Sequence, residues 1–334
     1  MAGPFFSVLV TAYNRADEIE RCVRSCTEQT YDDFEIVVVD DGSTDATGTV
    51  LAGLGEPRLR TVRHDQNRGI SPARATAVEH ARGEWLVIVD SDWTLLPHAL
   101  ERLRAVIDLL PPGVRLIRSR LQSDDGHLDP AIMPAPNGAA AITDYHGRLL
   151  WLEAIALARA SSDAGHCIHR SVFEATNYFA DRRGAMETLW ELNLARRESS
   201  LWVSDVLGLQ HTDASNSHTR SADPRQLIPR LLGEAPDGQW MAETMLAEHG
   251  TDLARFAPHY RRWLVENAAV HAFLAGDRIA GIRHTWSAVR AGSVDANVWA
   301  TCVLGILGPK PLAYAKLARR RARAARHATP SWRN

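Results

Sequence analysis

Three apolar, largely β-branched runs near the N-terminus each stop abruptly at polar or acidic residues. The runs and the residues that follow them are FFSVLVTA (5–12) before Tyr13-Asn14, EIVVV (35–39) before Asp40-Asp41-Gly42-Ser43, and EWLVIV (84–89) before Asp90-Ser91-Asp92. Continuous apolar runs of this length are typical of strands covered on both faces. The segments between them have helical spacing. This alternation predicts an α/β fold in which helices flank a mainly parallel sheet.

The rest of the chain divides into two parts by its pattern. In the first part we expect helices at 19–27, 45–54, 71–81, 97–110, 149–160 and 184–197, strands at 59–63 and 201–207, and loops at 122–147 and 212–225. From residue 226 the spacing is helical to the end of the chain. We therefore expect an α/β domain over residues 1–220 and a helical C-terminal region over residues 221–334.

The composition argues against several classes of protein. With 38 Lys or Arg against 40 Asp or Glu, the formal net charge is −2, which gives no support to a nucleic-acid partner. Four cysteines without a CxxC pair argue against zinc and for buried thiols in a reducing compartment. The N-terminus lacks the features of a signal peptide, and the apolar stretch 298–307 is far shorter than the roughly 20 residues of a membrane span. We expect a cytoplasmic protein.

The acidic residues after the strands are candidates for a ligand site. Ligands of parallel sheets bind beyond the carboxyl ends of the strands. Asp90 and Asp92 form a DxD motif there, whose oxygens suit Mg²⁺ or Mn²⁺ and thereby a diphosphate, although most DxD sequences are turns or helix caps. Asp40 and Asp41 also suit turns and caps, and one of them could accept a hydrogen bond from a pyrimidine edge. The chain contains neither GxGxxG nor GxxxxGK[ST], which excludes those two phosphate-binding motifs.

Five ordered segments resemble the family 2 glycosyltransferases, the inverting enzymes of the GT-A fold. The segments are VLVTAYN (8–14), EQTYDDFE (28–35), IVVVDDGSTD (36–45), NRGISPAR (67–74) and GEWLVIVDSD (83–92). The resemblance extends over residues 5–110 and more loosely over 165–217. It implies a nucleotide-sugar-binding and catalytic domain in residues 1–220, and an enzyme of the hexosyltransferase type.

The resemblance also implies a donor site. Its members are Thr11 and Tyr13 at the nucleotide, with Tyr13 on the base, Asp41 at the base edge, Arg74 at the diphosphate or base, Asp90 near the ribose and Asp92 on the metal. Trp93 stands where the family often has a further acid, so the metal has one fewer ligand. His211 could supply that ligand as a neutral imidazole. The alternative for His211 is a solvated loop histidine.

Inversion at the anomeric carbon requires a carboxylate that deprotonates the acceptor hydroxyl. In the family this base follows a segment similar to CIHRSVF (167–173), which here leads to Met186-Glu187 in place of the usual Glu-Asp pair. The resemblance therefore implies Glu187 as the base. Glu191, one turn further on the same helix face, is the alternative. Either residue could instead be an ordinary helix-surface glutamate.

The sequence predicts an inverting, metal-assisted transferase that uses a nucleotide-diphosphate sugar, with a UDP-sugar favoured. The acceptor stays open among a glycan, a lipid-linked sugar, a protein and a small molecule. From Lys316 onward there are seven Lys or Arg and no acid, so this tail either contacts an anionic membrane peripherally or is a solvated end. A sugar-nucleotidyltransferase is an alternative, although its Gly-rich loop is missing. A non-catalytic nucleotide-sugar-binding protein is another, because Trp93 and Met186 depart from the family pattern.

Overall fold

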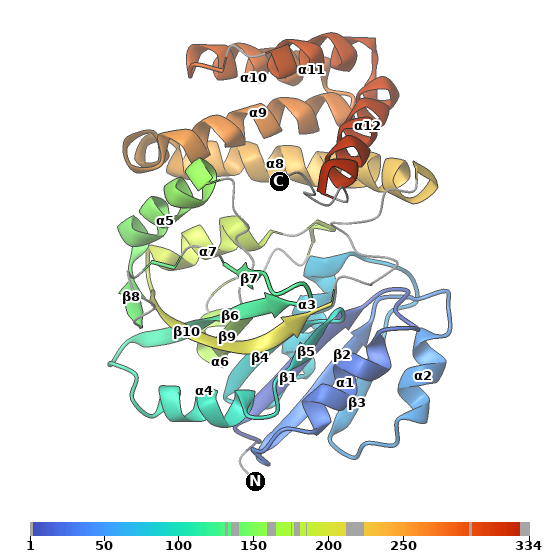
Figure 1. Cartoon of the computed structure of the whole chain (residues 1–334), viewed down its shortest axis with the longest axis vertical. Helices are drawn as coiled ribbons and strands as arrows, with labels where there is room; N and C mark the ends of the chain where they lie inside the picture. The colour runs from blue at the N-terminus through green and yellow to red at the C-terminus, as the bar shows by residue number, and fades with distance from the viewer. Residues whose placement is uncertain are drawn as a thin grey trace, which may run out of the picture. The chain divides into compact units, whose positions relative to one another are not determined.

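The computed structural model describes residues 3–130, 133–134, 140–158, 165–174, 176, 181–184, 186–211, 224–293 and 296–327. The chain divides into two compact units, Met1–Ser217 and His218–Asn334, which are described one at a time (Figure 1). Most of the loop expected at 212–225 lies outside the described residues.

The first unit alternates strands and helices over its first half. Its elements are β1 Phe6–Ala12, α1 Ile19–Thr27, β2 Phe34–Asp40, α2 Thr47–Gly53, β3 Leu59–Arg63, α3 Ile70–His80, β4 Trp85–Asp90, β5 Trp93–Leu95, α4 Ala99–Ile107, β6 Val114–Ser123, β7 Leu128–Asp129, β8 Ala141–Thr143, α5 Tyr145–Ala158, β9 Gly165–His169, α6 Arg170–Glu174, α7 Glu187–Ala195 and β10 Ser199–Gln210. The predicted α/β class is confirmed.

The described strands of this unit form a ten-stranded sheet in the order β3-β2-β1-β4-β9-β6-β10-β5, with β7 on β6 and β8 on β10. The four strands from β3 to β4 run parallel, as predicted. Beyond them β9 pairs antiparallel with both β4 and β6, so the sheet is mixed rather than mainly parallel. The segment 122–147, expected as a loop, contains the end of β6 and the short strands β7 and β8.

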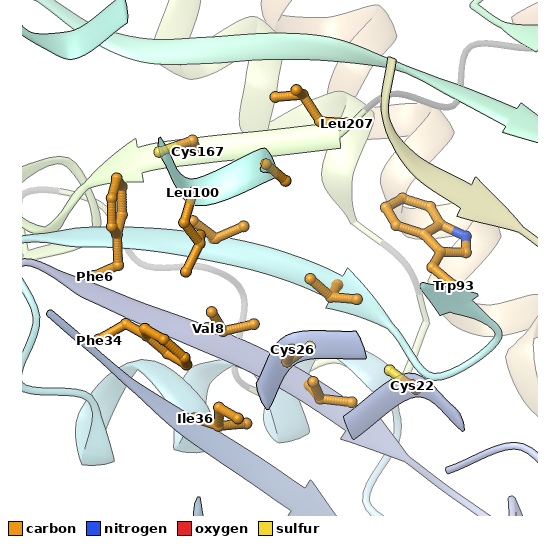
Figure 2. Packing of buried hydrophobic residues seen from close by; sticks show 14 of the residues in the cluster. Phe6, Val8, Cys22, Cys26, Phe34, Ile36, Trp93, Leu100, Cys167 and Leu207 are labelled. Carbon is orange, nitrogen blue, oxygen red and sulfur yellow. The ribbon is translucent and has the colours of Figure 1, made fainter. Parts of the chain in front are cut away.

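Alternate residues of the parallel strands enter two different cores. Val8 and Ile36 belong to one hydrophobic cluster, which also takes in α1, α2 and α4. Figure 2 shows this cluster, with Cys22 and Cys26 of α1 packed over the strands. Leu9 belongs to the cluster on the other face, which contains residues of α3, α6 and α7. Apolar burial on both faces explains why these strands are continuously apolar in sequence.

The second unit is helical, as predicted for the C-terminal region (Figure 1). Its helices are α8 Pro224–Phe256, α9 Pro258–Leu274, α10 Arg278–Arg290, α11 Ala296–Leu307 and α12 Pro309–His327. Its core gathers residues of α8, α9 and α12 around the fully buried ring of Phe273. None of the helices within the described residues is both long and apolar enough to cross a membrane.

Candidate functional site

The carboxyl ends of β2, β1 and β4 lie side by side at one edge of the sheet. The strand register pairs Ala12 with Asp40 and Thr11 with Asp90, and the Asp41 amide donates to the Ala12 carbonyl at 2.8 Å. Residues that are far apart in the chain therefore meet at this edge. It is the edge where the sequence predicts the ligand site.

Arg74 joins three elements at this edge. Its guanidinium lies on α3, is only 6% exposed, and donates from one terminal nitrogen to Asp90 Oδ1 at 2.8 Å. The other terminal nitrogen pairs with the carboxylate of Glu187, the first residue of α7. The side chain of Glu187 is 36% exposed, so it is accessible to a bound molecule. Three of the predicted site residues are thus in direct contact.

The segment that leads into α7 is attached to the start of α3. The Ile70 amide donates to the Arg183 carbonyl at 3.1 Å, and Ser71 Oγ donates to the Gly184 carbonyl at 2.7 Å. Gly69 has a φ of 103°, and a Cβ there would overlap the Arg183 backbone. Only glycine adopts this conformation readily and permits so close an approach. These contacts hold the chain just before α7, whose first residue, Glu187, pairs with Arg74.

Asp41 is buried and holds the loop before α3. Its two carboxylate oxygens accept from the Arg68 amide at 2.9 Å and the Gly69 amide at 2.8 Å. His64 Nδ1 lies 2.6 Å from the same carboxylate, and His64 Nε2 lies 3.0 Å from Thr76 Oγ1. Asp41 thereby fixes the start of the helix that carries Arg74. Its expected contact with a base stays a prediction.

Asp40 serves the turn after β2. One of its oxygens accepts from the Ser43 amide at 2.9 Å, and the other pairs with Arg63. Ser43 Oγ in turn accepts from the amide of Asn14, whose φ is 53°. This turn adjoins Tyr13, whose ring is 37% exposed beyond β1 and accessible to a stacking partner.

His211 lies next to Asp92 because β10 pairs with β5. Gln210 is in register with Trp93, and the His211 amide donates to the Asp92 carbonyl at 2.9 Å. The His211 ring is 3.0 Å from Thr94 Oγ1 through Nε2. Trp93 is buried in the core cluster on this side of the sheet (Figure 2), so the departure from the family acid serves packing.

The carboxylate of Asp92 and the imidazole of His211 are of the type that binds a divalent cation whose remaining ligands are substrate oxygens. No group of three or more His, Cys, Asp or Glu side chains suited to a metal occurs in the part of the chain that the structure describes. Mg²⁺ is usually held by one or two carboxylates together with substrate phosphates, not by an all-protein cage. A carboxylate and an imidazole at this edge of the sheet are compatible with that pattern.

Glu191 has the environment of a structural carboxylate. It is buried, forms ion pairs with Arg118 at 2.5 Å and with Arg148, and lies 2.9 Å from His166 Nε2. Burial alone would raise the pKa of the Glu191 carboxyl, but the two guanidinium charges and the His166 hydrogen bond hold it well below its ordinary value. Such a carboxylate is a poor proton acceptor. The geometry therefore favours Glu187 over Glu191 as a base.

Three residues of this region, His64, Arg118 and Arg148, were not predicted from the sequence. His64 follows β3 and contacts Asp41, so the rule that polar residues follow strand ends could have found it. Arg118 lies on β6, whose sequence VRLIRSRLQS alternates in the way of a strand, but its arginines hide the apolar pattern. Nothing in the sequence around Arg148 predicts that its side chain is buried, because the partner that makes burial possible, Glu191, is far away in the chain.

Comparison with known proteins agrees with this geometry. The family model described as glycosyl transferase family 2 matches residues 7–135. The succinoglycan biosynthesis protein ExoO of Rhizobium meliloti is 42% identical over 100 residues, which cover 30% of this chain and 29% of that protein. The putative glycosyltransferase EpsH of Bacillus subtilis is 36% identical over 104 residues, which cover 31% of this chain and 30% of that protein.

Solved structures share the fold at low sequence identity. TarS 1–349 of S. aureus superposes with a TM-score of 0.54 at 17% identity and covers 86% of this chain and 92% of its own. The mannosyltransferase PcManGT of Pyrobaculum calidifontis was solved in complex with GDP-Man and Mn²⁺. It superposes with a TM-score of 0.52 at 20% identity, and the match covers 95% of this chain and 87% of PcManGT.

The sheet, its polar edge and the family match together define a glycosyltransferase domain of the GT-A fold. Residues 7–135 therefore form a domain of the glycosyl transferase family 2 type. The matched part of the chain spans between 29% and 39% of the lengths of the first three curated relatives.

Proposed function

We propose that this chain transfers a sugar from a nucleotide-diphosphate sugar to an acceptor hydroxyl with inversion, using Glu187 as the general base. The observation that carries the proposal is the contact of Arg74 with both Asp90 and Glu187. It brings a cation suited to a diphosphate and a carboxylate suited to a base to the edge where GT-A folds bind donors.

The same contact suggests how donor binding prepares the base. Before a donor binds, the guanidinium charge of Arg74 is balanced by Asp90 and Glu187. A diphosphate is a stronger partner for that guanidinium than a single carboxylate. Its arrival draws Arg74 away from Glu187, which then faces the acceptor hydroxyl as a carboxylate able to take its proton.

For the nucleotide we assign Tyr13 to the base face, Thr11 to the nucleotide entry, Asp41 to the base edge and Asp90 to the ribose. A uridine nucleotide is favoured, and structures of TarS 1–349 with UDP and with UDP-GlcNAc support this choice. Asp92 and His211 would hold Mg²⁺ or Mn²⁺, and PcManGT was solved with Mn²⁺. The cation would neutralise charge on the leaving diphosphate.

A peripheral membrane contact through the basic tail is part of the proposal. Within α12 the side chain of Lys316 is half-buried, and its desolvation lowers its pKa, so Lys316 adds less to a surface patch than an exposed lysine would. Arg319 is exposed. The side chains of Arg320, Arg321, Arg323 and Arg326 are outside the described part of the chain, and so is Arg333.

The first test is a panel of UDP-, GDP- and dTDP-sugars, each with and without Mn²⁺, read by thermal shift and by release of the nucleotide diphosphate. A ligand at 100 times its Kd stabilises the folded state by about 2.7 kcal/mol, which is readily detected. We expect at least one donor to bind and to be turned over with metal. If no sugar nucleotide binds, the proposed function is wrong.

The second test is Glu187→Gln, with Glu79→Gln on the exposed end of α3 as the matched control. Loss of a general base lowers the rate by about 10²–10⁴-fold. We expect a loss of that size for Glu187→Gln with donor affinity within a few-fold of wild type, and full activity for the control. Full activity of Glu187→Gln would remove Glu187 from the base role.

A further inference from the structure

Two helices of the second unit carry apolar stripes that are exposed. On α10 the stripe consists of Ile279, Ile282 and Trp286, spaced three and four residues apart. On α11 the matching stripe consists of Trp299, Val303 and Ile306, spaced four and three residues apart. These spacings bring each set to one side of its helix. Trp286 is 55% exposed and Trp299 44%.

The two stripes form one surface, called here the tryptophan face and made of those six residues. The rings of Trp286 and Trp299 meet edge to face with their centroids 6.2 Å apart. On the other sides of the helices, Gly281 and Gly305 pack against the ring of Phe273. The apolar side chains of the face are therefore not the ones that build the core.

Positive charge accompanies this surface. Arg283 and Arg290 follow Ile279 and Trp286 by four residues each, so they lie on the same side of α10. Arg283 also pairs with Glu243 of α8 at 3.0 Å. Over residues 278–327 the sequence has ten Lys or Arg and a single Asp, whereas the whole chain has a formal net charge of −2. The rest of the chain therefore has a net negative charge, and the basic excess of this segment falls on α10 and α12, because α11 has no Lys or Arg.

We propose that the tryptophan face docks the chain onto a membrane surface that contains anionic lipid. Tryptophan side chains settle at the boundary between headgroups and acyl chains, and basic side chains beside them are attracted to anionic headgroups. With 13 and 12 residues, α10 and α11 are too short to cross a bilayer and lie along its surface instead.

A second copy of the chain is the competing occupant of the face. Helix α10 has three Arg and no Asp or Glu. Docking two copies through this surface would bring their α10 helices together, and like charges disfavour such an interface. An anionic lipid surface complements the same charge. The charge therefore favours lipid over self-association.

The test is co-sedimentation of the full chain with vesicles of phosphatidylcholine alone and of equal parts phosphatidylcholine and phosphatidylglycerol. We expect binding at least tenfold stronger to the anionic vesicles, weakening as salt is raised. The variant Trp286→Ser/Trp299→Ser should lose at least tenfold in binding. Trp263→Ser removes a tryptophan of similar exposure on α9 and should change binding less than twofold.

Val303→Asp is a second variant that places a charge on the face without disturbing the tryptophan pair, and it should lose binding likewise. Equal binding of wild type and both face variants would overturn the proposal, as would loss of binding only when residues 320–334 are deleted. A wild-type dimer that the face variants convert to monomer, without vesicle binding, would assign the face to a second copy. The readout needs no glycosyl transfer, and Glu187→Gln should bind vesicles like wild type, so this proposal and the proposed function fail separately.

Discussion

Glu187 and Glu191 lie one turn apart on α7 and have opposite surroundings. Glu187 is partly exposed and pairs with Arg74, while Glu191 is buried between Arg118 and Arg148. A base needs access to its proton donor, and a structural carboxylate needs permanent partners. The surroundings of Glu187 suit the proposed base, and those of Glu191 suit a structural carboxylate.

Replacing Glu191 tests its structural role. Glu191→Gln leaves the buried charges of Arg118 and Arg148 uncompensated, and breaking a buried pair in this way costs about 3–5 kcal/mol. We expect a loss of that order in the free energy of unfolding at pH 7, measured by urea denaturation, and almost no loss for Glu79→Gln. A loss below 1 kcal/mol would mean that the network is not a stabilising one.

The pH dependence of this loss has a definite sign. The pKa of Glu191 is lower in the folded chain than its ordinary value of about 4.3, so its stabilisation is complete above that pH. It disappears as the pH falls through the folded pKa. The difference between wild type and Glu191→Gln should therefore shrink below about pH 4.

Local patterns explain which site residues were predictable. Thr11, Tyr13, Asp41, Asp90 and Asp92 directly follow or end apolar strands, and their placement at one edge follows from strand register. Their roles toward a donor stay predictions. A buried arginine opposite a distant glutamate leaves no such pattern, because burial of a charge depends on a partner that only the fold brings near.

At the scale of elements, one aromatic ring sets the spacing of three helices. Phe273 of α9 is fully buried, and both Gly281 of α10 and Gly305 of α11 face its ring. A Cβ on Gly281 would lie 2.6 Å from the ring, and one on Gly305 would overlap it. Helices α10 and α11 can approach α9 this closely because neither has a side chain at the contact.

This packing predicts opposite effects for two Gly→Ala substitutions. Gly305→Ala should lower the free energy of unfolding by about 1–3 kcal/mol, because an overpacked core must shift its neighbours. Gly250→Ala on α8 has open space within 4 Å and should raise it by up to about 1 kcal/mol through helix propensity. Urea denaturation of both variants measures the pair. Equal effects would show that the helices are not held by this contact.

β1 was predictable to within one or two residues from its continuous apolar run, and so were α1 from its helical spacing and the more polar strand β3. β6 and β9 were missed because arginine, serine and histidine interrupt their apolar residues. Both strands nevertheless lie inside the sheet, where Arg118 and His166 find buried partners in Glu191. Composition does not identify as strands those segments whose polar side chains form their hydrogen bonds and ion pairs only in the folded chain.

At the scale of the whole molecule, each unit has its own core and a half-buried histidine whose pKa is lowered. In the sheet unit, burial lowers the pKa of His166. In the helical unit, burial and the neighbouring Lys316 lower the pKa of His271 to about 4. A histidine that stays neutral when folded makes both units sensitive to acid below the ordinary histidine pKa of about 6.5.

The sign follows from proton binding. Between about pH 6.5 and pH 4 the unfolded chain takes up a proton at His271 and the folded chain does not, so the stability that is present above pH 6.5 falls by up to about 1.4 kcal/mol per pH unit. Calorimetry of the wild type between pH 7.5 and pH 5 should show two transitions that both move to lower temperature. His271→Leu should flatten only the transition of the helical unit, and His166→Gln only the other. If the transition of the helical unit still moves fully with pH in His271→Leu, His271 does not cause its acid sensitivity. If both variants change a single common transition, the two units do not unfold separately.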